Sequence, residues 1–441
     1  MTPSARLAAA IDLLGALEAE RRRPADAIAH AFFRGRRYIG AGDRRAVSAQ
    51  AWGVVRQRLR LEWWLGRLGV APTSRLLAAA HALLAERRLL SAVGGLFTGD
   101  RYGPAPLSGM EQGVLRALAD QPLVVPEMPD GPRLNLPDWA LPGLRARFGE
   151  DLAAEAAAME AEAPLDLRAN LLKGTRAAAA AALAGEGINT EPTPISPWGL
   201  RIPSRRPVTG SATYRAGLVE VQDEGSQVIA ALADARPGLR ICDLCAGAGG
   251  KTLAMAAVMA NRGRITACDV NAPRLEGAAL RLRRAGVDNA ERHLLAAGDK
   301  WAKRRAGQFD RVLVDAPCTG TGTWRRNPDG RTRTGAGDLA ALLAKQGEIL
   351  SMSAELVRPG GLLVYATCSL LPEEDEGQVT AFLARRPDFM PLPLAGAWAG
   401  ARLPGVPPSC PAAAGPNLLL SPARHGTDGF FAAVLRRAAP G

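Results

Sequence analysis

The sequence predicts an α/β protein whose carboxyl-terminal half folds around a mainly parallel sheet. From about residue 237 onward, apolar strand segments alternate with helical segments, and glycine or acidic turns separate them. This alternation is typical of parallel strands joined by crossover helices. Residues 1 to about 130 instead carry apolar side chains at helical spacing. A stretch rich in proline and glycine follows them, so we expect more than one domain.

The composition favours a polyanionic partner. Lys and Arg total 55 against 43 Asp and Glu, which gives a formal net charge of +12 that suits phosphate contacts. We find no apolar run of about 18 residues and no signal-peptide profile at the start of the sequence. Six cysteines without a regular framework fit a reducing compartment. We therefore expect a cytoplasmic protein that binds no membrane.

Residues 1–130 are expected to form an all-helical domain. Helical patterns occupy residues 6–19, 23–35, 43–68 and 74–90. Arginines cluster there with aromatic residues, among them Arg34, Arg37, Tyr38 and Trp64. Aromatic residues at helical spacing more often fill a core than stack on bases. We expect the tryptophans to lie mainly in the core and some of the arginines to contact nucleic acid.

Residues 131–215 are expected to form a linker and a small mixed unit. Helical patterns at 144–163 and 176–187 are interleaved with strand patterns at 166–173, 197–203 and 216–222. This alternation predicts a compact α+β unit in front of a third domain, residues 216–441.

The third domain carries the strand and helix patterns of the parallel sheet. Strands are expected at 238–244, 263–270, 291–296, 309–316, 360–367 and 430–437, and helices at 251–260, 272–286, 339–357 and 374–386. The carboxyl ends of parallel strands meet at one edge, where ligands bind in open α/β folds. Candidate site residues are therefore those that follow each strand.

A glycine loop follows the first of these strands. Gly247, Gly249 and Gly250 let backbone approach a ligand closely at the start of a helix. Asp269 ends the next strand about twenty residues later, where a carboxylate can accept hydrogen bonds from both hydroxyls of a ribose. Asp299 follows the third strand and can read an adenine amino group. These residues predict a cofactor that contains adenosine.

A dinucleotide would fit the same residues, because its fingerprint also combines glycines with an acidic ribose ligand. The sequence after the fourth strand decides against it. There the chain reads DAPCTGTG, and after the next strand it reads ATCSLLPEEDE. Cys318 and Cys368 are thus expected at the edge of the sheet where ligands bind.

Two cysteines at such an edge suit the methylation of cytosine at C5. This carbon is a poor nucleophile until a thiolate adds to C6, and a base must later remove the C5 proton so that the thiol can leave. Asp315 can hold N3 or the exocyclic amine of the ring. Free cysteines elsewhere more often pack in cores, and we prefer that interpretation for Cys268 and Cys410. Cys242 and Cys245 lack the further ligands of a zinc site, so we expect no metal ion.

At DAPCTGTG and ATCSLLPEEDE the sequence resembles the RsmB-type (Sun or Fmu) members of the RNA cytosine-C5 methyltransferase family. The resemblance covers nearly the whole chain and is strongest from about residue 215 to 437. DNA cytosine methyltransferases use only the proline-cysteine site as nucleophile, and the tetrad of the amino-group methyltransferases is absent. The resemblance implies a Rossmann-like class I methyltransferase domain with an antiparallel last strand. A small RNA-recognition-like unit and an all-α NusB-like domain would precede it.

The same resemblance implies S-adenosylmethionine as the cofactor and Cys368 as the nucleophile, with Cys318 assisting release of the product. It implies a set of cofactor contacts: Cys245, Ala246, Gly247, Ala248, Gly249, Gly250, Lys251, Asp269, Asp299 and Asp315. Three residues would contact RNA: Arg325, Arg326 and Asn327. VQDEGSQ at 221–227 and HGTDGFF at 425–431 resemble further motifs of the family.

A NusB-like domain would make ribosomal RNA the substrate, with a cytosine of 16S rRNA as the target, and we expect a monomer. Two alternatives stay open, the same chemistry on transfer RNA and a catalytically idle RNA-binding assembly factor. The sequence also departs from the family pattern at two places. Ala248 stands where a proline is common, which affects the rigidity of the loop. Residues 330–337 lack a common lysine and tryptophan, which leaves contacts to the target undefined.

Overall fold

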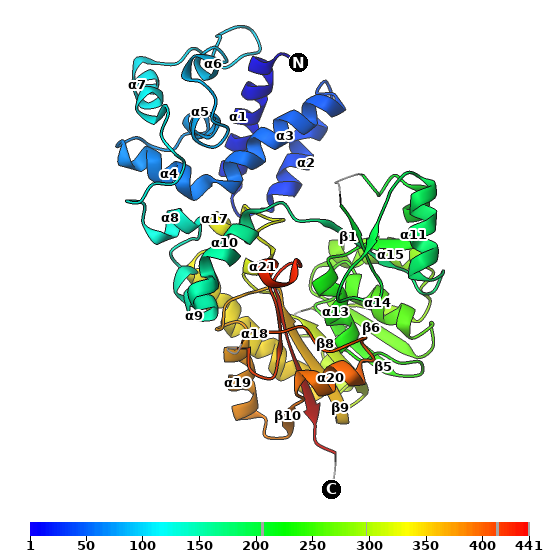
Figure 1. Cartoon of the computed structure of the whole chain (residues 1–441). Helices are drawn as coiled ribbons and strands as arrows, with labels where there is room; N and C mark the ends of the chain where they lie inside the picture. Colours follow the sequence, from blue (N-terminus) through cyan, green and yellow to red (C-terminus); the bar gives the residue numbers. More distant parts are fainter. Residues whose placement is uncertain (204–206, 297, 412–413, 440–441) are drawn as a thin grey trace. The chain divides into compact units, whose positions relative to one another are not determined.

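The computed structural model describes residues 1–203, 207–296, 298–411 and 414–439. Contacts divide the chain into two units (Figure 1). Unit 1 comprises Met1–Pro142 and Arg326–Gly335, and unit 2 comprises Gly143–Arg325 and Ala336–Gly441. A short segment after Arg325 thus belongs to unit 1 before the chain returns to unit 2. The boundaries at 130 and 215 stay a prediction.

In the residues that the structure describes, every regular element of unit 1 is a helix. Its elements are α1 (Pro3–Ala19), α2 (Ala25–Gly35), α3 (Ala41–Arg56), α4 (Arg58–Arg67), α5 (Ser74–Leu84), α6 (Leu90–Gly94), α7 (Gly109–Leu118), α8 (Asp130–Leu134) and α17 (Gly330–Arg333). The apolar helix α5 is buried along its length and contacts α1, α3, α4 and α7. Its burial explains why this unit needs no sheet to form a core.

Two details of unit 1 differ from the sequence pattern. The segment expected as one helix at 43–68 divides at Gln57 into α3 and α4. The stretch rich in proline and glycine contains α7, whose start is stabilised by reciprocal hydrogen bonds between Ser108 and Glu111. Trp64 is buried, and its Nε1 donates to the carbonyl of Leu123 at 3.0 Å, as expected of a core tryptophan.

Unit 2 starts with a small antiparallel sheet of order β2-β3-β1-β4. Its strands and neighbouring helices are α9 (Leu141–Phe148), which begins just before the unit, η1 (Gly149–Asp151), α10 (Leu152–Glu160), β1 (Leu165–Ala169), α11 (Arg176–Gly185), β2 (Glu191–Pro192), β3 (Gly199–Ile202), α12 (Ala212–Arg215) and β4 (Val219–Val221). Leu167, Leu183, Leu200 and Val219 meet in one apolar cluster under α11. The predicted α+β unit is therefore present, with the short edge strand β2 in addition.

The large sheet of unit 2 has the order β10-β12-β9-β8-β5-β6-β7, and β11 pairs with β12. Its strands are β5 (Arg240–Leu244), β6 (Arg264–Asp269), β7 (Ala290–Leu294), β8 (Phe309–Asp315), β9 (Val357–Thr367), β10 (Phe389–Pro391), β11 (Leu418–Leu420) and β12 (Phe430–Arg437). Strands β5 to β9 pair in parallel, and β12 runs antiparallel beside β9. The predicted antiparallel last strand is confirmed.

Helices cover both faces of this sheet (Figure 1). The remaining elements of unit 2 are α13 (Glu224–Leu232), α14 (Gly250–Val258), α15 (Ala272–Ala285), α16 (Trp301–Arg304), η2 (Thr321–Thr323), α18 (Ala336–Leu356), α19 (Glu376–Arg385), α20 (Leu394–Gly400) and α21 (Pro422–His425). One apolar cluster joins α13, α14 and α20 to one face, and α18 contacts β8 and β9. This arrangement leaves the carboxyl edge of the parallel strands to the loops.

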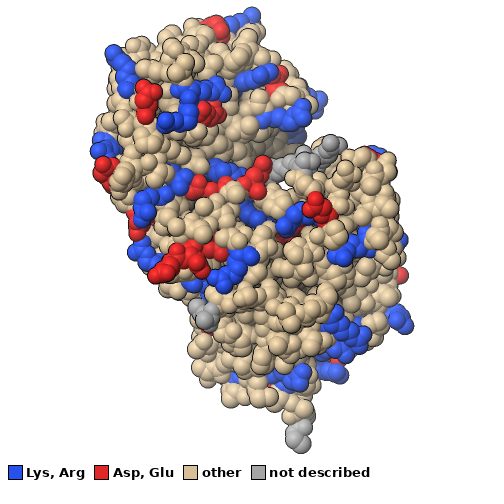
Figure 2. All heavy atoms as spheres, viewed as in Figure 1, with Lys and Arg blue, Asp and Glu red and all other residues tan. Residues whose placement is uncertain are grey.

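The surface carries both signs of charge. In Figure 2, Lys and Arg side chains are spread over the visible face and alternate with Asp and Glu. Across the described ranges, no helix combines the length and the apolar character that a membrane crossing requires.

Candidate active site

The glycine loop turns sharply over the end of β5. Cys245, Gly247 and Gly249 have φ angles of +63°, +55° and +77°, the left-handed region that favours glycine. Cys245 adopts this conformation without being glycine, which costs of order 1 kcal/mol. The helix α14 begins immediately afterwards at Gly250. Backbone therefore lines the approach to the start of α14, a position where side chains would otherwise obstruct a ligand.

Asp269 ends β6, and Asp299 lies in the loop that follows β7. The carboxylate of Asp269 accepts hydrogen bonds from the backbone N–H groups of Gly247 (2.7 Å) and Asn271 (2.8 Å). Asp299 is exposed, and its Oδ2 lies 2.6 Å from Nε2 of His293. A carboxylate has about four acceptor positions, so both groups can accept further bonds from a ribose or an adenine amine. These positions fit a cofactor that contains adenosine.

Two arginines that the sequence did not single out hold the carbonyl groups of the glycine loop. Arg168 of β1 donates to the oxygen of Gly250 at 2.8 Å, and Arg281 of α15 donates to that of Ala248 at 2.8 Å. Arg281 also pairs with the buried Glu220. Burial lowers the pKa of Arg168 to about 10. In the sequence, the only sign of this role of Arg168 is that a charged residue stands inside the strand pattern at 166–173.

Lys251 and Asp315 join the glycine loop to β8. Nζ of Lys251 lies 2.6 Å from Oδ2 of Asp315, and the lysine is buried in the first turn of α14. Burial and the nearby charges of Asp315 and Asp269 raise the pKa of Cys245 to about 12. Cys245 is therefore a neutral thiol and is unsuited to nucleophilic attack.

Cys318 and Cys368 come together at the edge of the sheet. Strands β8 and β9 are parallel neighbours, and Asp315 lies opposite Ala366 near their ends. The two sulfur atoms are 3.4 Å apart, and both side chains are half-buried. The hydrogen bond to Cys368 and burial raise the pKa of Cys318 well above its usual value. Cys318 is thus held as a thiol beside the sulfur of Cys368.

The other cysteines lie away from this pair. Cys242 and Cys268 are fully buried in β5 and β6, and the sulfur of Cys410 accepts a hydrogen bond from the backbone of Leu419. These positions agree with packing roles. In the residues described, no three His, Cys, Asp or Glu side chains are grouped to hold a metal ion.

The loop after Cys318 packs tightly against the HGTDGFF segment. The N–H of Gly429 donates to the carbonyl of Gly322 at 2.8 Å. A Cβ at Gly322 would lie only 2.3 Å from the oxygen of Gly429, so this approach requires glycine. The N–H of Gly322 also donates to the carbonyl of Cys368 at 3.0 Å. The two cysteine loops are thereby fixed to each other.

Arg325 is buried inside unit 2, and its contact with RNA stays a prediction. It is 5% exposed, and its guanidinium bonds Asp428 (2.5 Å), Asp223 (3.4 Å) and the carbonyl of Gly426 (3.2 Å). Asp223 also accepts the N–H of Asp428. These partners hold the guanidinium between the VQDEGSQ and HGTDGFF segments. Arg326 is half-buried and Asn327 is exposed; both belong to unit 1, and their contact with RNA stays a prediction.

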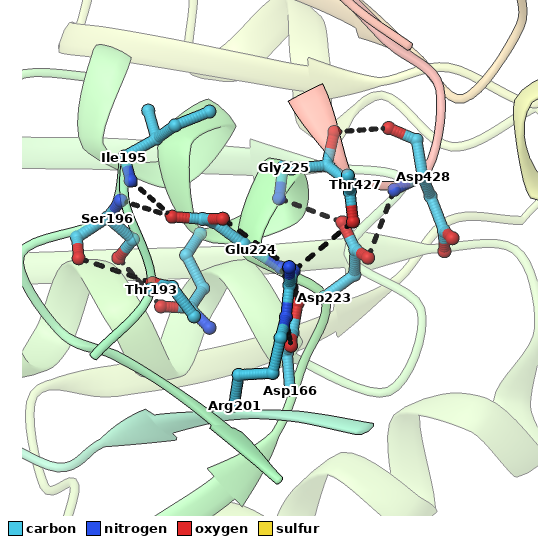
Figure 3. Close-up of polar contacts among 12 residues, drawn as sticks. Asp166, Thr193, Ile195, Ser196, Arg201, Asp223, Glu224, Gly225, Thr427 and Asp428 are labelled. Carbon is cyan, nitrogen blue, oxygen red and sulfur yellow. Dashed lines mark hydrogen bonds and ion pairs between the residues drawn. The ribbon is translucent and has the colours of Figure 1, made fainter. Parts of the chain in front are cut away.

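The VQDEGSQ segment fastens the small sheet to the large one. Figure 3 shows Glu224 accepting the N–H groups of Ile195 (2.5 Å) and Ser196 (2.7 Å), while Arg201 pairs with Asp166 at 2.7 Å. Burial raises the pKa of Glu224. The segments 221–227 and 425–431 therefore build the frame of the site.

Comparison of the sequence with known proteins identifies the family of this chain. The family model described as 16S rRNA methyltransferase RsmB/F matches residues 230–436. A second model, the ferredoxin-like domain of RsmF/B-like methyltransferases, matches residues 136–209. Ribosomal RNA small subunit methyltransferase B of Photorhabdus laumondii is 32% identical over 78% of this chain and 83% of its own length. The enzyme of the same name from Thermus thermophilus is 35% identical over 75% of this chain and 71% of its own length.

Solved structures have the same fold. The crystal structure of PH0851 superposes with a TM-score of 0.78 at 24% identity and covers 99% of both chains. A methyltransferase homologue from Pyrococcus horikoshii gives a TM-score of 0.60 at 29% identity over 71% of this chain and all of its own. The ferredoxin-like match agrees with the small sheet, whereas the likeness of the helical unit to NusB stays a prediction. The relatives cover most of the sequence, and the chain belongs to the RsmB/F family of 16S rRNA methyltransferases.

Proposed function

We propose that this RNA methyltransferase methylates C5 of a cytosine in 16S ribosomal RNA through a covalent bond between Cys368 and C6. Its cofactor is S-adenosylmethionine. The substrate follows from the relatives, which are named for the small-subunit ribosomal RNA. The choice of ring position follows from the two cysteines.

The residues at the ends of β5, β6 and β7 fit S-adenosylmethionine. Asp269 retains acceptor capacity for the ribose, Asp299 for the adenine amine, and the left-handed glycine loop keeps side chains out of the approach. When bound, S-adenosylmethionine supplies the electrophilic methyl group that C5 takes. The contacts of the individual loop residues with it are part of this proposal.

The distance of 3.4 Å between the two sulfur atoms carries the assignment. C5 and C6 of a pyrimidine are bonded neighbours, so a nucleophile at C6 and a group that acts at C5 must lie close to each other. A pair of half-buried thiols at a ligand-binding edge meets this requirement. Packing alone does not require two cysteines at the ends of adjacent strands.

The proposed roles follow from the positions of the two sulfur atoms. The Cys368 thiolate forms a bond to C6, and the ring electrons move toward C5. After methylation the C5 proton passes to the sulfur of Cys318, the C5–H electrons restore the C5–C6 double bond, and the bond from Cys368 to C6 breaks. Cys318 starts as a thiol, so its own proton must first pass to solvent water, and the thiolate that remains is a strong base because its pKa is raised.

Asp315 is the third residue of the proposed catalytic set, beside Cys318 and Cys368. Its Oδ2 is engaged by Lys251, and its other oxygen can accept the exocyclic amine or hold the proton at N3. A proton at N3 draws electrons from the ring and favours attack at C6, and a carboxylate at either position stabilises this protonated form. The ion pair keeps the carboxylate at the end of β8, directly before the Cys318 loop.

The function is tested by incubating the protein with S-adenosylmethionine that is labelled in its methyl group and with purified 16S ribosomal RNA or transfer RNA. We expect label in 5-methylcytidine of the ribosomal RNA. Label in 5-methylcytidine of transfer RNA alone would overturn the substrate and keep the chemistry. Label in any other nucleoside, or none with either RNA or with small-subunit particles, would contradict the proposed reaction.

A further inference from the structure

Glu374 is a fully buried carboxylate beside the Cys318 loop. Its Oε1 accepts the backbone N–H of Thr319 at 2.9 Å, and its Oε2 accepts the hydroxyl of Thr319 at 2.5 Å. Gln346 donates a further bond to Oε1 at 3.0 Å. Among the described residues, no lysine or arginine pairs with this carboxylate. Burying an unpaired charge is costly, so these hydrogen bonds hold it in place.

Gln346 of α18 fixes the backbone on the other side of Cys318. Its Nε2 donates to the carbonyl of Pro317 at 3.0 Å as well as to Glu374. The side chain of Gln346 is fully buried. The peptide groups before and after Cys318 are therefore both fixed, one by Gln346 and one by Glu374.

Cys368 is held by other contacts. Its carbonyl accepts the N–H of Gly322, and the hydroxyl of Thr367 before it donates to Asp375 at 2.6 Å. The backbone of Ser369 after it donates to the same hydroxyl. Loss of the Glu374 side chain would loosen the Cys318 loop at Thr319 and leave the contacts of Thr367 with Asp375 and Ser369 intact.

We infer that Glu374 is a positioning residue that keeps the sulfur of Cys318 within reach of the C5 proton, and that product release depends on it. This inference rests on the proposed roles of the two cysteines. A displacement of about 1 Å in a reacting group can slow a step by about 100-fold. The step that suffers is the one in which Cys318 takes part, whereas attack by Cys368 proceeds.

Glutamine at this position should restore the function. An amide oxygen can accept from the backbone of Thr319 and from Gln346, and its NH₂ group can donate to the hydroxyl of Thr319. Glu374→Gln thus keeps the contacts without the charge, and Glu374→Ala removes them. Rescue by glutamine separates positioning of the loop from a chemical role of the carboxylate.

The experiment follows the covalent complex between the full-length protein and labelled 16S ribosomal RNA on denaturing gels, with S-adenosylmethionine present. We expect Glu374→Ala to accumulate the complex and to release it about 100-fold more slowly than the unmodified protein. Glu374→Gln should release it within about tenfold of the unmodified rate. In a Cys318→Ala background, Glu374→Ala should slow release no further, because both changes act on one group.

Glu155→Ala is the matched control. Glu155 is buried and accepts a hydroxyl (Ser421, 2.5 Å) and a backbone N–H (Ala423, 3.0 Å), the same pattern as Glu374. Its loss should lower stability without accumulation of the complex. Accumulation in both variants would show a general effect of lost packing and overturn the inference.

Release at the unmodified rate in Glu374→Ala would overturn the inference, and so would loss of methylation without any complex. If that variant does not fold, as judged by lost binding of S-adenosylmethionine, Thr319→Val carries the test, because it removes only one hydroxyl. We then expect release slowed about fivefold, and an unchanged rate would overturn the inference. Failure of Cys318→Ala itself to accumulate the complex would instead refute the proposed roles of the cysteines.

Discussion

The ammonium group of Lys251 lies 2.6 Å from the carboxylate of Asp315. Lys251 belongs to the first turn of α14, and Asp315 ends β8. The ammonium group also lies 5.8 Å from the ring centroid of Phe430, on β12. One side chain therefore ties the cofactor loop to the strand that leads to Cys318.

Replacing Lys251 by methionine tests this tie. The substitution keeps the buried alkyl chain and leaves the carboxylate of Asp315 without its cation. We expect the Kd for S-adenosylmethionine to rise about tenfold, the effect of about 1.4 kcal/mol, as measured by equilibrium titration. Lys345→Met is the control, because Lys345 is exposed and pairs with the exposed Glu348. An unchanged Kd in Lys251→Met would show that the ion pair does not shape the loop.

Asp243 predicts a pH dependence of stability. This side chain is fully buried, Thr252 donates to its Oδ2 at 2.5 Å, and burial raises its pKa to about 7. The folded state binds a proton that the unfolded state has lost above about pH 4, so the carboxylate lowers the free energy of unfolding as the pH rises from about 4 to 7. Above about pH 7, the pKa of Asp243 in the folded state, this loss of stability is complete.

Asp243→Asn should remove this dependence. Relative to the unmodified protein, its free energy of unfolding should gain a few kcal/mol between pH 4 and pH 8, since each pKa unit corresponds to about 1.4 kcal/mol. Urea titrations of both proteins at the two pH values measure the difference. Parallel pH profiles would contradict a protonated Asp243 in the folded state.

We expect the buried ion pair between Arg147 and Asp375 to be costly to break. Its fully buried guanidinium bonds Asp375 at 2.9 Å, Glu376 at 2.6 Å and the carbonyl of Leu370. Arg147→Met leaves the buried carboxylate of Asp375 without its cation, and we expect a loss of about 3 to 5 kcal/mol in urea unfolding. Adding Asp375→Asn should recover part of it. Arg424→Met, which breaks the exposed pair with Asp151, should cost less than about 1 kcal/mol.

The sequence predicted the architecture well where a local pattern reports the structure. The parallel strands β5 to β9 and the cysteine pair follow from alternation of apolar segments and from the rule that ligands bind at the carboxyl edge. The short strands β10 and β11 carry too few residues for a periodic signal. They form because β12 offers partners that are distant in the sequence.

Side-chain roles in the frame of the site were harder to predict. Arg325 lies next to a cysteine motif and has the residue type of an RNA contact, yet Asp223 and Asp428, about 100 residues away on either side, bury it. Arg168 and Glu374 likewise act through contacts that only the folded chain creates. Sequence spacing reports faces of helices and strands, and such long-range pairings leave no periodic trace.

Substitutions of exposed arginines in unit 1 and of Arg325 should change the salt dependence of RNA binding differently. Arg34 and Arg37 are exposed, whereas Arg325 is buried. If the exposed pair contacts phosphates, the double variant Arg34→Ala/Arg37→Ala should lower the slope of log K against log salt by about 1 to 2, and Arg325→Gln should leave the slope unchanged and lower stability. Filter binding to 16S ribosomal RNA at several salt concentrations measures the slopes. An equal reduction in both variants would show that Arg325 also contacts RNA.

Trapping of the covalent intermediate tests the reaction itself. Cys318→Ala and Cys368→Ala are each incubated with 16S ribosomal RNA and S-adenosylmethionine, and the protein–RNA complex that survives denaturation is quantified. We predict a stable complex with Cys318→Ala, because the nucleophile remains and release is blocked, and none with Cys368→Ala. A complex with Cys368→Ala alone would exchange the two roles, and no complex with either variant would contradict covalent catalysis by this pair.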